Sequence, residues 1–158
     1  MDHDDLLRKQ LVKLLTSSEA HADFESAIKE LPSELQGKVP EGAEHSPWQL
    51  LEHIRLAQED ILDFSRNAKY ETKQWPGDYW PKDPEPPNAK AWDKSVKAIR
   101  EDVKEFAELI SDKKNDLYAK IPHGDGQTLL REALLLADHN AYHVGQLVTV
   151  RRLLGAWQ

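Results

Sequence analysis

The sequence predicts an all-α fold, a four-helix bundle in one domain. Apolar residues recur at intervals of three and four in four segments, about residues 4–31, 46–67, 89–112 and 128–154. No segment alternates polar and apolar residues over the length of a strand, and no internal repeat is visible. The 158 residues suffice for one domain of ordinary size, so we expect a single bundle over residues 1–158.

The first predicted helix, residues 4–31, has a polar interruption in its apolar stripe. Polar groups buried without partners cost about 1–3 kcal/mol each, so the interruption needs an explanation. A pocket beside His21 and Glu25 would explain it, and so would an internal hydrogen-bond cluster or a turn of the stripe that stays exposed. The stripe consists of Leu7, Leu11, Leu14, Ser18, His21, Glu25 and Ile28.

The second predicted helix, residues 46–67, has a well-defined start. Ser46 is placed to cap it, Pro47 occupies the first helical position, and Gln49 completes a capping box. The third predicted helix, residues 89–112, carries an uninterrupted apolar stripe that indicates a purely structural role.

Between these two helices lies "KYETKQWPGDYWPKDPEPPN", which is longer than an ordinary bundle connection. It contains Trp75, Tyr79 and Trp80, and disordered segments are poor in such aromatic residues because those side chains favour burial. We therefore expect a long ordered loop packed over one end of the bundle, rather than a disordered linker.

The fourth predicted helix, residues 128–154, contains two histidines four residues apart. His139 and His143 share a helix face, so both imidazoles can reach one ion, although such a pair also arises by chance. His53 on the second helix would supply a third ligand if the two helices are neighbours. Three imidazoles and an open position are typical of catalytic zinc sites. The alternative is that the three histidines are ordinary core or surface residues.

Composition excludes several classes of function. The chain has no cysteine, so a metal site must use nitrogen and oxygen ligands, and no disulfide or cysteine nucleophile is available. A net charge of −7 argues against nucleic acid as a partner. The N-terminus does not resemble a signal peptide, and no apolar run could span a membrane. We expect a cytoplasmic protein that acts on a small molecule, with no membrane or nucleic-acid partner.

The segments "SPWQLLEHIRLAQEDIL" and "ADHNAYHVGQLVTVRRLLG", joined by an aromatic and proline-rich connection, resemble the DinB/YfiT superfamily. The resemblance covers nearly the whole chain. It implies a four-helix bundle of unusual topology, a homodimer, and one divalent ion such as zinc or nickel held by His53, His139 and His143. Characterised relatives include thiol-dependent transferases and isomerases that use bacillithiol or mycothiol, so a low-molecular-weight thiol is a possible cosubstrate here.

Other polar residues are candidates for the surroundings of such a site. Glu132 and Gln146 share a face with the histidine pair, and either could orient an imidazole or a substrate. His123, in the turn "IPHGDGQ", could close over the site, although loop histidines are usually solvated. We expect Asp60 to form an ion pair with a basic residue such as Arg55 or Arg131. His21 and Glu25 complete the set of pocket candidates.

Two hypotheses about function follow from these residues. The first is an enzyme that uses one divalent ion for thiol-dependent transfer or hydrolysis of a small molecule. Asn140 stands where metalloproteases of the H-E-x-x-H type have their glutamate, which argues against a protease. The alternative is a non-catalytic metal-binding or stress-response bundle in which the ion is structural. Since the chain lacks cysteine, any thiol must come from a small cofactor.

Overall fold

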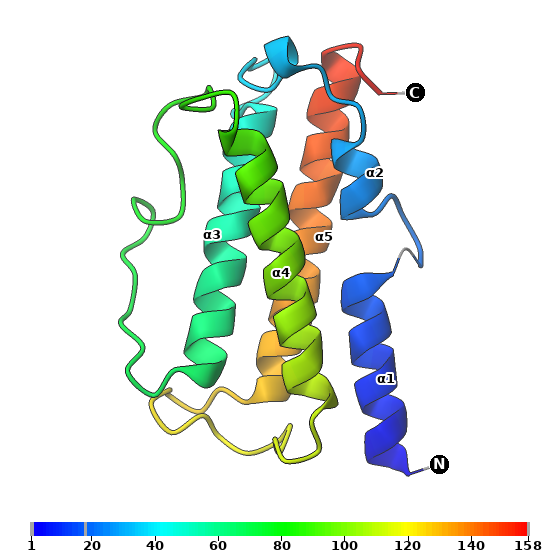
Figure 1. The fold of residues 1–158 in the computed structure, drawn as a ribbon, viewed down its shortest axis with the longest axis vertical. Coiled ribbons are helices and arrows are strands. Elements are labelled where there is room, and N and C mark those ends of the chain that lie inside the picture. Colours follow the sequence, from blue (N-terminus) through cyan, green and yellow to red (C-terminus); the bar gives the residue numbers. More distant parts are fainter. Residues whose placement is uncertain (1, 18, 158) are drawn as a thin grey trace.

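The computed structural model describes residues 2–17 and 19–157 and confirms the all-α fold class. Within these residues there is no strand, and one isolated bridge pairs Lys120 with Thr128. A short 3-10 turn, Ser33–Leu35, precedes α3. The helices in chain order are α1 His3–Thr16, α2 Phe24–Ile28, α3 Pro47–Arg66, α4 Ala91–Ser111 and α5 Leu129–Leu153 (Figure 1).

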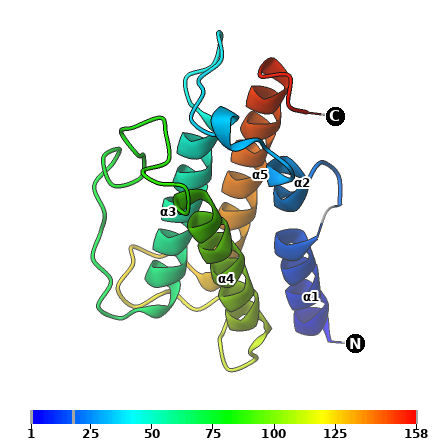
Figure 2. The same cartoon turned by 45° about the horizontal axis from the view of Figure 1, so that its top comes forward.

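The long helices α3, α4 and α5 form the centre of the bundle. Helix α3 packs against both α4 and α5, whereas α1 packs against α4 and α5 and the short α2 packs against α5. Figures 1 and 2 show α1 and α2 following one another along one side, while the connection between α3 and α4 runs along the opposite side, beside α3. None of the described helices is both long enough and apolar enough to cross a bilayer.

Apolar side chains bury themselves in two clusters, one toward each end of the bundle. The first joins α2, the start of α3, the start of α4 and the end of α5, and includes Leu51, Ile54 and Leu147. The second joins α1, the ends of α3 and α4 and the start of α5, and includes Phe106 and Leu136. These clusters supply the main stabilisation, since each large apolar side chain contributes about 1.5–3 kcal/mol on burial.

The prediction of one helix over residues 4–31 is wrong, because α1 ends at Thr16 and α2 begins at Phe24. Residues 19–23 offer only the small side chains of Ala20 and Ala22 for burial, so a continuous helix would gain little from packing there. The Asp23 side chain caps α2 by accepting from the Ser26 backbone N–H. Ser18, one of the polar stripe residues, lies outside the described residues.

The other three helices lie within two residues of the predicted segments. At the start of α3 the Ser46 side chain accepts from the Gln49 backbone N–H, and the Gln49 side chain accepts from the Ser46 backbone N–H, each at 3.1 Å. With Pro47 in the first turn, this is the capping box that the sequence predicts.

Two buried arginines attach the N-terminal helices to the rest of the bundle. Arg8 of α1 donates to the carbonyl oxygen of Ile110, at 2.6 Å, in the last turn of α4, and to that of Asn115, at 2.8 Å, in the segment that follows this helix. Arg151 of α5 donates to the carbonyl oxygen of Ala27 in α2, at 2.8 Å. Helix C-terminal carbonyls lack partners within their own helix and carry partial negative charge, so a guanidinium stabilises them.

Replacement of Arg8 by methionine should lower the free energy of unfolding by about 2–4 kcal/mol, because buried carbonyl groups lose charge-assisted hydrogen bonds. Urea unfolding followed by circular dichroism measures this effect. Lys97→Met is the matched control, since the Lys97 side chain is 76% exposed and its loss should change stability by less than about 0.5 kcal/mol. Equal stability of both variants would show that Arg8 does not anchor α1.

Candidate metal centre

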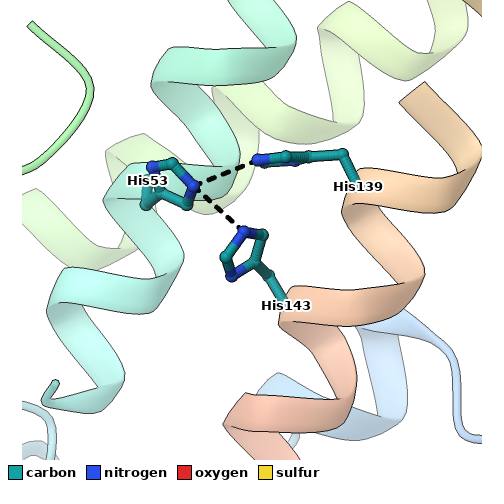
Figure 3. A group of neighbouring side chains, drawn as sticks. All are labelled: His53, His139 and His143. Carbon is teal, nitrogen blue, oxygen red and sulfur yellow. Dashed lines mark hydrogen bonds between the residues drawn. The ribbon is translucent and has the colours of Figure 1, made fainter. Parts of the chain in front are cut away.

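Three imidazole rings meet between α3 and α5 (Figure 3). His53 lies two turns into α3, and His139 and His143 lie one turn apart on α5. The Nε2 atom of His53 is 3.0 Å from the Nε2 atom of His139 and 3.0 Å from the Nε2 atom of His143. The structure therefore brings together the three histidines that the sequence picks out.

Two of these rings have their proton positions set by neighbouring acceptors. The Nδ1 atom of His53 lies 2.9 Å from the Tyr79 carbonyl oxygen, which can only accept, so Nδ1 carries the proton. The Nδ1 atom of His143 similarly donates to the Gln146 Oε1 atom at 2.7 Å. In their neutral forms, both rings therefore present a lone pair at Nε2.

Two lone pairs 3.0 Å apart cannot form a hydrogen bond, and they repel unless a cation lies between them. Nitrogens that share a zinc ion through bonds of about 2.0–2.1 Å lie about 3.3 Å apart at tetrahedral angles. Imidazole is a suitable ligand for zinc, nickel, copper and iron. The donor atoms and their spacing thus fit one transition-metal ion.

Burial keeps these rings uncharged. Desolvation lowers the pKa of His53 and of His143 from 6.5 to about 4. Burial is also the main cause that lowers the pKa of His139, and the nearby His53 lowers it further. Neutral imidazole is the form that binds a metal, so near pH 7 no proton needs to leave before an ion can bind.

Residues of the connection between α3 and α4 fix the orientation of the His53 ring. The Trp80 ring stacks on the His53 ring with centroids 3.8 Å apart and an interplanar angle of 5°. His45 covers the other face of Trp80, with centroids 4.1 Å apart. Together with the Nδ1 bond to Tyr79, this stack fixes the plane and the rotation of the His53 ring.

Asp60 anchors the same connection. Its carboxylate accepts from the hydroxyl groups of Tyr70 and Tyr79, at 3.0 and 2.7 Å, so the expected ion pair with an arginine is wrong. Arg55 instead pairs with Glu52 and Glu59. Burial and the Asp60 charge raise the pKa of Tyr70 to about 12 and also raise that of Tyr79, which keeps both hydroxyls protonated as donors.

The ordered connection follows one side of the bundle, and does not cover one end as expected. Its carbonyl oxygens accept from side chains spaced along α3: Pro84 from Ser46, Pro81 from Gln49 and Tyr79 from His53. These donors lie at the cap and in the first two turns of α3, and Asp60 holds Tyr70 and Tyr79 farther along the same helix, so the connection runs beside it (Figure 1).

Two exposed aromatic side chains flank the histidines. Trp75 is 70% exposed and meets the His53 ring edge-on, with centroids 6.3 Å apart. Tyr142 is 64% exposed and meets the His143 ring edge-on, with centroids 5.0 Å apart. Large aromatic groups on a surface beside buried polar nitrogens can contact a small organic molecule.

The remaining pocket candidates are distributed differently. Gln146 contacts the histidine cluster directly, through its hydrogen bond to the ring one turn before it. Glu132 is buried but pairs with Arg131, at 2.8 Å, and with none of the three histidines. The Nε2–H group of His123 donates to the Phe64 carbonyl oxygen, at 2.8 Å, which holds this ring away from the cluster.

His21 and Glu25 line a cavity of about 550 Å³ between the α1–α2 side of the bundle and helices α4 and α5. Glu25 also forms a bidentate ion pair with Arg100, at 2.6 and 2.7 Å. The cavity lining includes residues of α1 and α2 and none of the three histidines, whereas His53 contacts the connection between α3 and α4 through Tyr79. The polar stripe residues therefore border a cavity other than the histidine site.

Sequence reasoning missed three partners of the site. Trp80 was recognised only as an aromatic that needs burial, and His45 had no assigned role, although both belong to the stack on His53. The Tyr79 carbonyl could not be found at all, because a backbone acceptor leaves no signal in the residue type.

Comparison with known proteins agrees with this architecture. The family model of the DinB superfamily matches residues 17–147, which include α2 to α4, all three histidines and most of α5. Neither a curated protein nor a solved structure matches the chain.

The metal-free protein should lose stability as the pH falls from about 6.5 toward 4. An unfolded chain protonates its histidines near pH 6.5, whereas folded His53 and His143 resist protonation down to about 4, so acid favours unfolding. Each histidine should contribute about 1 kcal/mol per pH unit in this window. Urea unfolding with a chelator present, at pH 6.5 and 5, measures the loss.

His143→Gln should reduce that pH dependence, since it removes one of the titrating rings and leaves the carboxyl groups unchanged. The difference in slope between the two proteins isolates the histidine. An identical pH dependence in the variant would mean that His143 is readily protonated in the folded protein.

Proposed function

The chain belongs to the DinB superfamily, and we propose that it is a divalent-metal-dependent enzyme that acts on a small molecule. The observation that carries the proposal is the convergence of the Nε2 atoms of His53, His139 and His143. The rings of His53 and His143 carry their protons on Nδ1, so their Nε2 atoms meet as lone pairs. Without a cation this arrangement is unfavourable, since it buries two polar atoms that repel each other.

In this proposal the three histidines hold one zinc, nickel or similar ion, which supplies Lewis-acid chemistry when bound. Three protein ligands leave coordination positions free, as in catalytic zinc sites. Tyr79 and Gln146 fix the protonation of two rings, and Trp80 excludes water from one face of His53. Gln146 also reaches the Tyr142 hydroxyl, at 3.4 Å, which links the site to its exposed aromatic edge.

The reaction that we propose is thiol-dependent transfer or hydrolysis. Soft thiolates bind zinc and nickel well, and Trp75 and Tyr142 offer a surface for the organic part of a substrate. With no cysteine in the chain, the thiol must be a low-molecular-weight cosubstrate. A supply of reduced thiol is a property of the cytoplasm, so a cytoplasmic location is part of the proposal.

The proposal also includes a homodimer, which the family resemblance implies. Light scattering tests the oligomeric state.

A structural ion is the alternative function, and the packing of the bundle disfavours it. The apolar clusters at both ends and the arginine anchors Arg8 and Arg151 join the helices without any contribution from the imidazoles. The fold therefore has a source of stability that does not depend on an ion.

The native protein, produced without a polyhistidine tag, should bind about one equivalent of zinc or nickel. His53→Ala, His139→Ala and His143→Ala should each weaken binding at least tenfold, because each loses one of three ligands. Isothermal titration calorimetry and elemental analysis measure affinity and stoichiometry. His123→Ala, which removes a histidine outside the cluster, should bind as the native protein does.

The same set of proteins distinguishes chemistry from binding. Turnover of electrophilic substrates with a low-molecular-weight thiol should require the ion, persist in His123→Ala and disappear in His143→Ala. Unchanged metal affinity in all three cluster variants would refute the metal site. Tight binding without turnover in any thiol or hydrolysis assay would favour the non-catalytic alternative.

Chelation should leave the helical circular dichroism signal intact. Removal of the ion should lower the free energy of unfolding only by the amount that ligand linkage predicts, about 2.7 kcal/mol at a free ion concentration one hundred times Kd, and Tm should fall accordingly. Thermal melting with and without chelator tests this expectation. Loss of helix on chelation at 25 °C would indicate that the ion is part of the fold.

A further inference from the structure

His139 differs from the other two histidines in the surroundings of its Nδ1 atom. Whereas the Nδ1 atoms of His53 and His143 contact an acceptor oxygen, that of His139 is buried without a hydrogen-bond partner. The adjacent residue, Asn140, also has a buried atom without a partner, its Oδ1 atom. Each such atom carries a desolvation cost of about 1–3 kcal/mol, so both require an explanation.

The orientation of the Asn140 amide is fixed by a chain of hydrogen bonds from α4. The Ile99 carbonyl oxygen can only accept, so it must face the Gln58 Nε2 group, at 2.7 Å. Gln58 then presents Oε1, which accepts from the Asn140 Nδ2 group at 2.9 Å. Gln58 is 0% exposed, so water cannot stabilise the reversed arrangement. Asn140 is left with Oδ1, an acceptor, as its free atom.

The free acceptor belongs to the residue that directly follows His139 on α5. His139 and Asn140 thus provide one potential donor and one obligate acceptor, both buried and neither satisfied elsewhere.

We propose that Gln58 and Asn140 form an amide relay that positions His139: Asn140 Oδ1 accepts the Nδ1 proton and thereby directs the Nε2 lone pair toward the other two rings. The inference rests on the proposed metal function. With it, all three rings share one pattern, in which Nδ1 donates to an oxygen and Nε2 remains free. Asn140 is a positioning residue, since it contacts the ring and not the ion.

The relay also explains why an asparagine stands at this position. The amide must donate to Gln58 on one side and accept from His139 on the other, and only a side chain with both groups can do so. A glutamate there, as in H-E-x-x-H sites, offers no donor to the Gln58 Oε1 atom.

Two variants of Asn140 separate positioning from structural support. Asn140→Leu removes both the donor and the acceptor, whereas Asn140→Asp keeps an acceptor for His139 and loses the donor to Gln58. We expect Asn140→Leu to weaken zinc binding by ten- to one hundredfold, and Asn140→Asp to retain affinity within about threefold of the native protein. A role limited to joining α3 and α5 through Gln58 predicts equal loss in both variants, and this result would overturn the proposal.

The protonation of His139 provides a second measurement that does not depend on the metal. Nitrogen-15 NMR of the metal-free native protein should show His139 with its proton on Nδ1, and Asn140→Leu should shift the proton toward Nε2. His53, whose proton is held by the Tyr79 carbonyl, is the internal reference. An unchanged His139 spectrum in Asn140→Leu, recorded on protein that circular dichroism shows to be folded, would overturn the relay.

Zinc binding and the His139 tautomer test the proposed function and the relay separately. If the native protein binds no zinc, the proposed function fails, and the tautomer of His139 still decides whether the relay exists. If zinc binds and the His139 tautomer is the same in native protein and in both variants, the metal site stands and the relay is wrong. Gln58→Leu is a further check, since freeing the Asn140 amide should reproduce part of the Asn140→Leu effect on the tautomer.

Discussion

The site between α3 and α5 depends on where each imidazole keeps its proton. His53 and His143 direct Nδ1–H to fixed oxygens, so their Nε2 lone pairs face one another in a buried space. This arrangement is electrostatically unfavourable in the protein without a cation. Protonation of a ring would relieve the repulsion, but burial lowers the pKa values of the rings and so disfavours it. The same features are favourable toward a cation, which gains several neutral nitrogen donors without having to displace protons.

Apolar packing in the rest of the bundle offsets the free-energy cost of burying these lone pairs. Apolar clusters lie on both sides of the histidines along the helix axes, and α3 and α5 contribute to both clusters. The connection between α3 and α4 then acts as a second layer: Asp60 holds Tyr79 by its hydroxyl, and the backbone of Tyr79 holds His53. A side chain on α3 thus determines, through a loop of the same chain, how another side chain on α3 is oriented.

The N-terminal helices α1 and α2 are separated by a polar segment. A helix that continued from α1 through residues 17–23 would have presented polar side chains to the core, so the chain instead ends α1, caps α2 with Asp23 and leaves a cavity bordered by His21 and Glu25. Buried arginines add to the apolar contacts of these helices, because Arg8 and Arg151 bind backbone carbonyls that would otherwise lack partners. Apolar packing of Leu11 and Ile28 and these polar interactions together hold the two N-terminal helices.

The sequence by itself determined whatever depends on neighbours within about one helical turn. The capping box at Ser46 and the shared face of His139 and His143 are local, so spacing was enough to predict them. Helical periodicity alone placed α3, α4 and α5, but it failed over residues 4–31, because it measures spacing and not whether a stripe position can be buried.

Only the tertiary structure decided the contacts that join distant segments. His53 reaches the histidine pair because α3 packs against α5, and no local pattern encodes that distance. The Tyr79 carbonyl and the Gln58–Asn140 amide pair are set by backbone groups and by hydrogen-bond direction, which the identity of a residue does not reveal. The three histidines of the candidate site could therefore be picked out from the sequence and its family resemblance, whereas the atoms that orient their rings emerged from the packed fold.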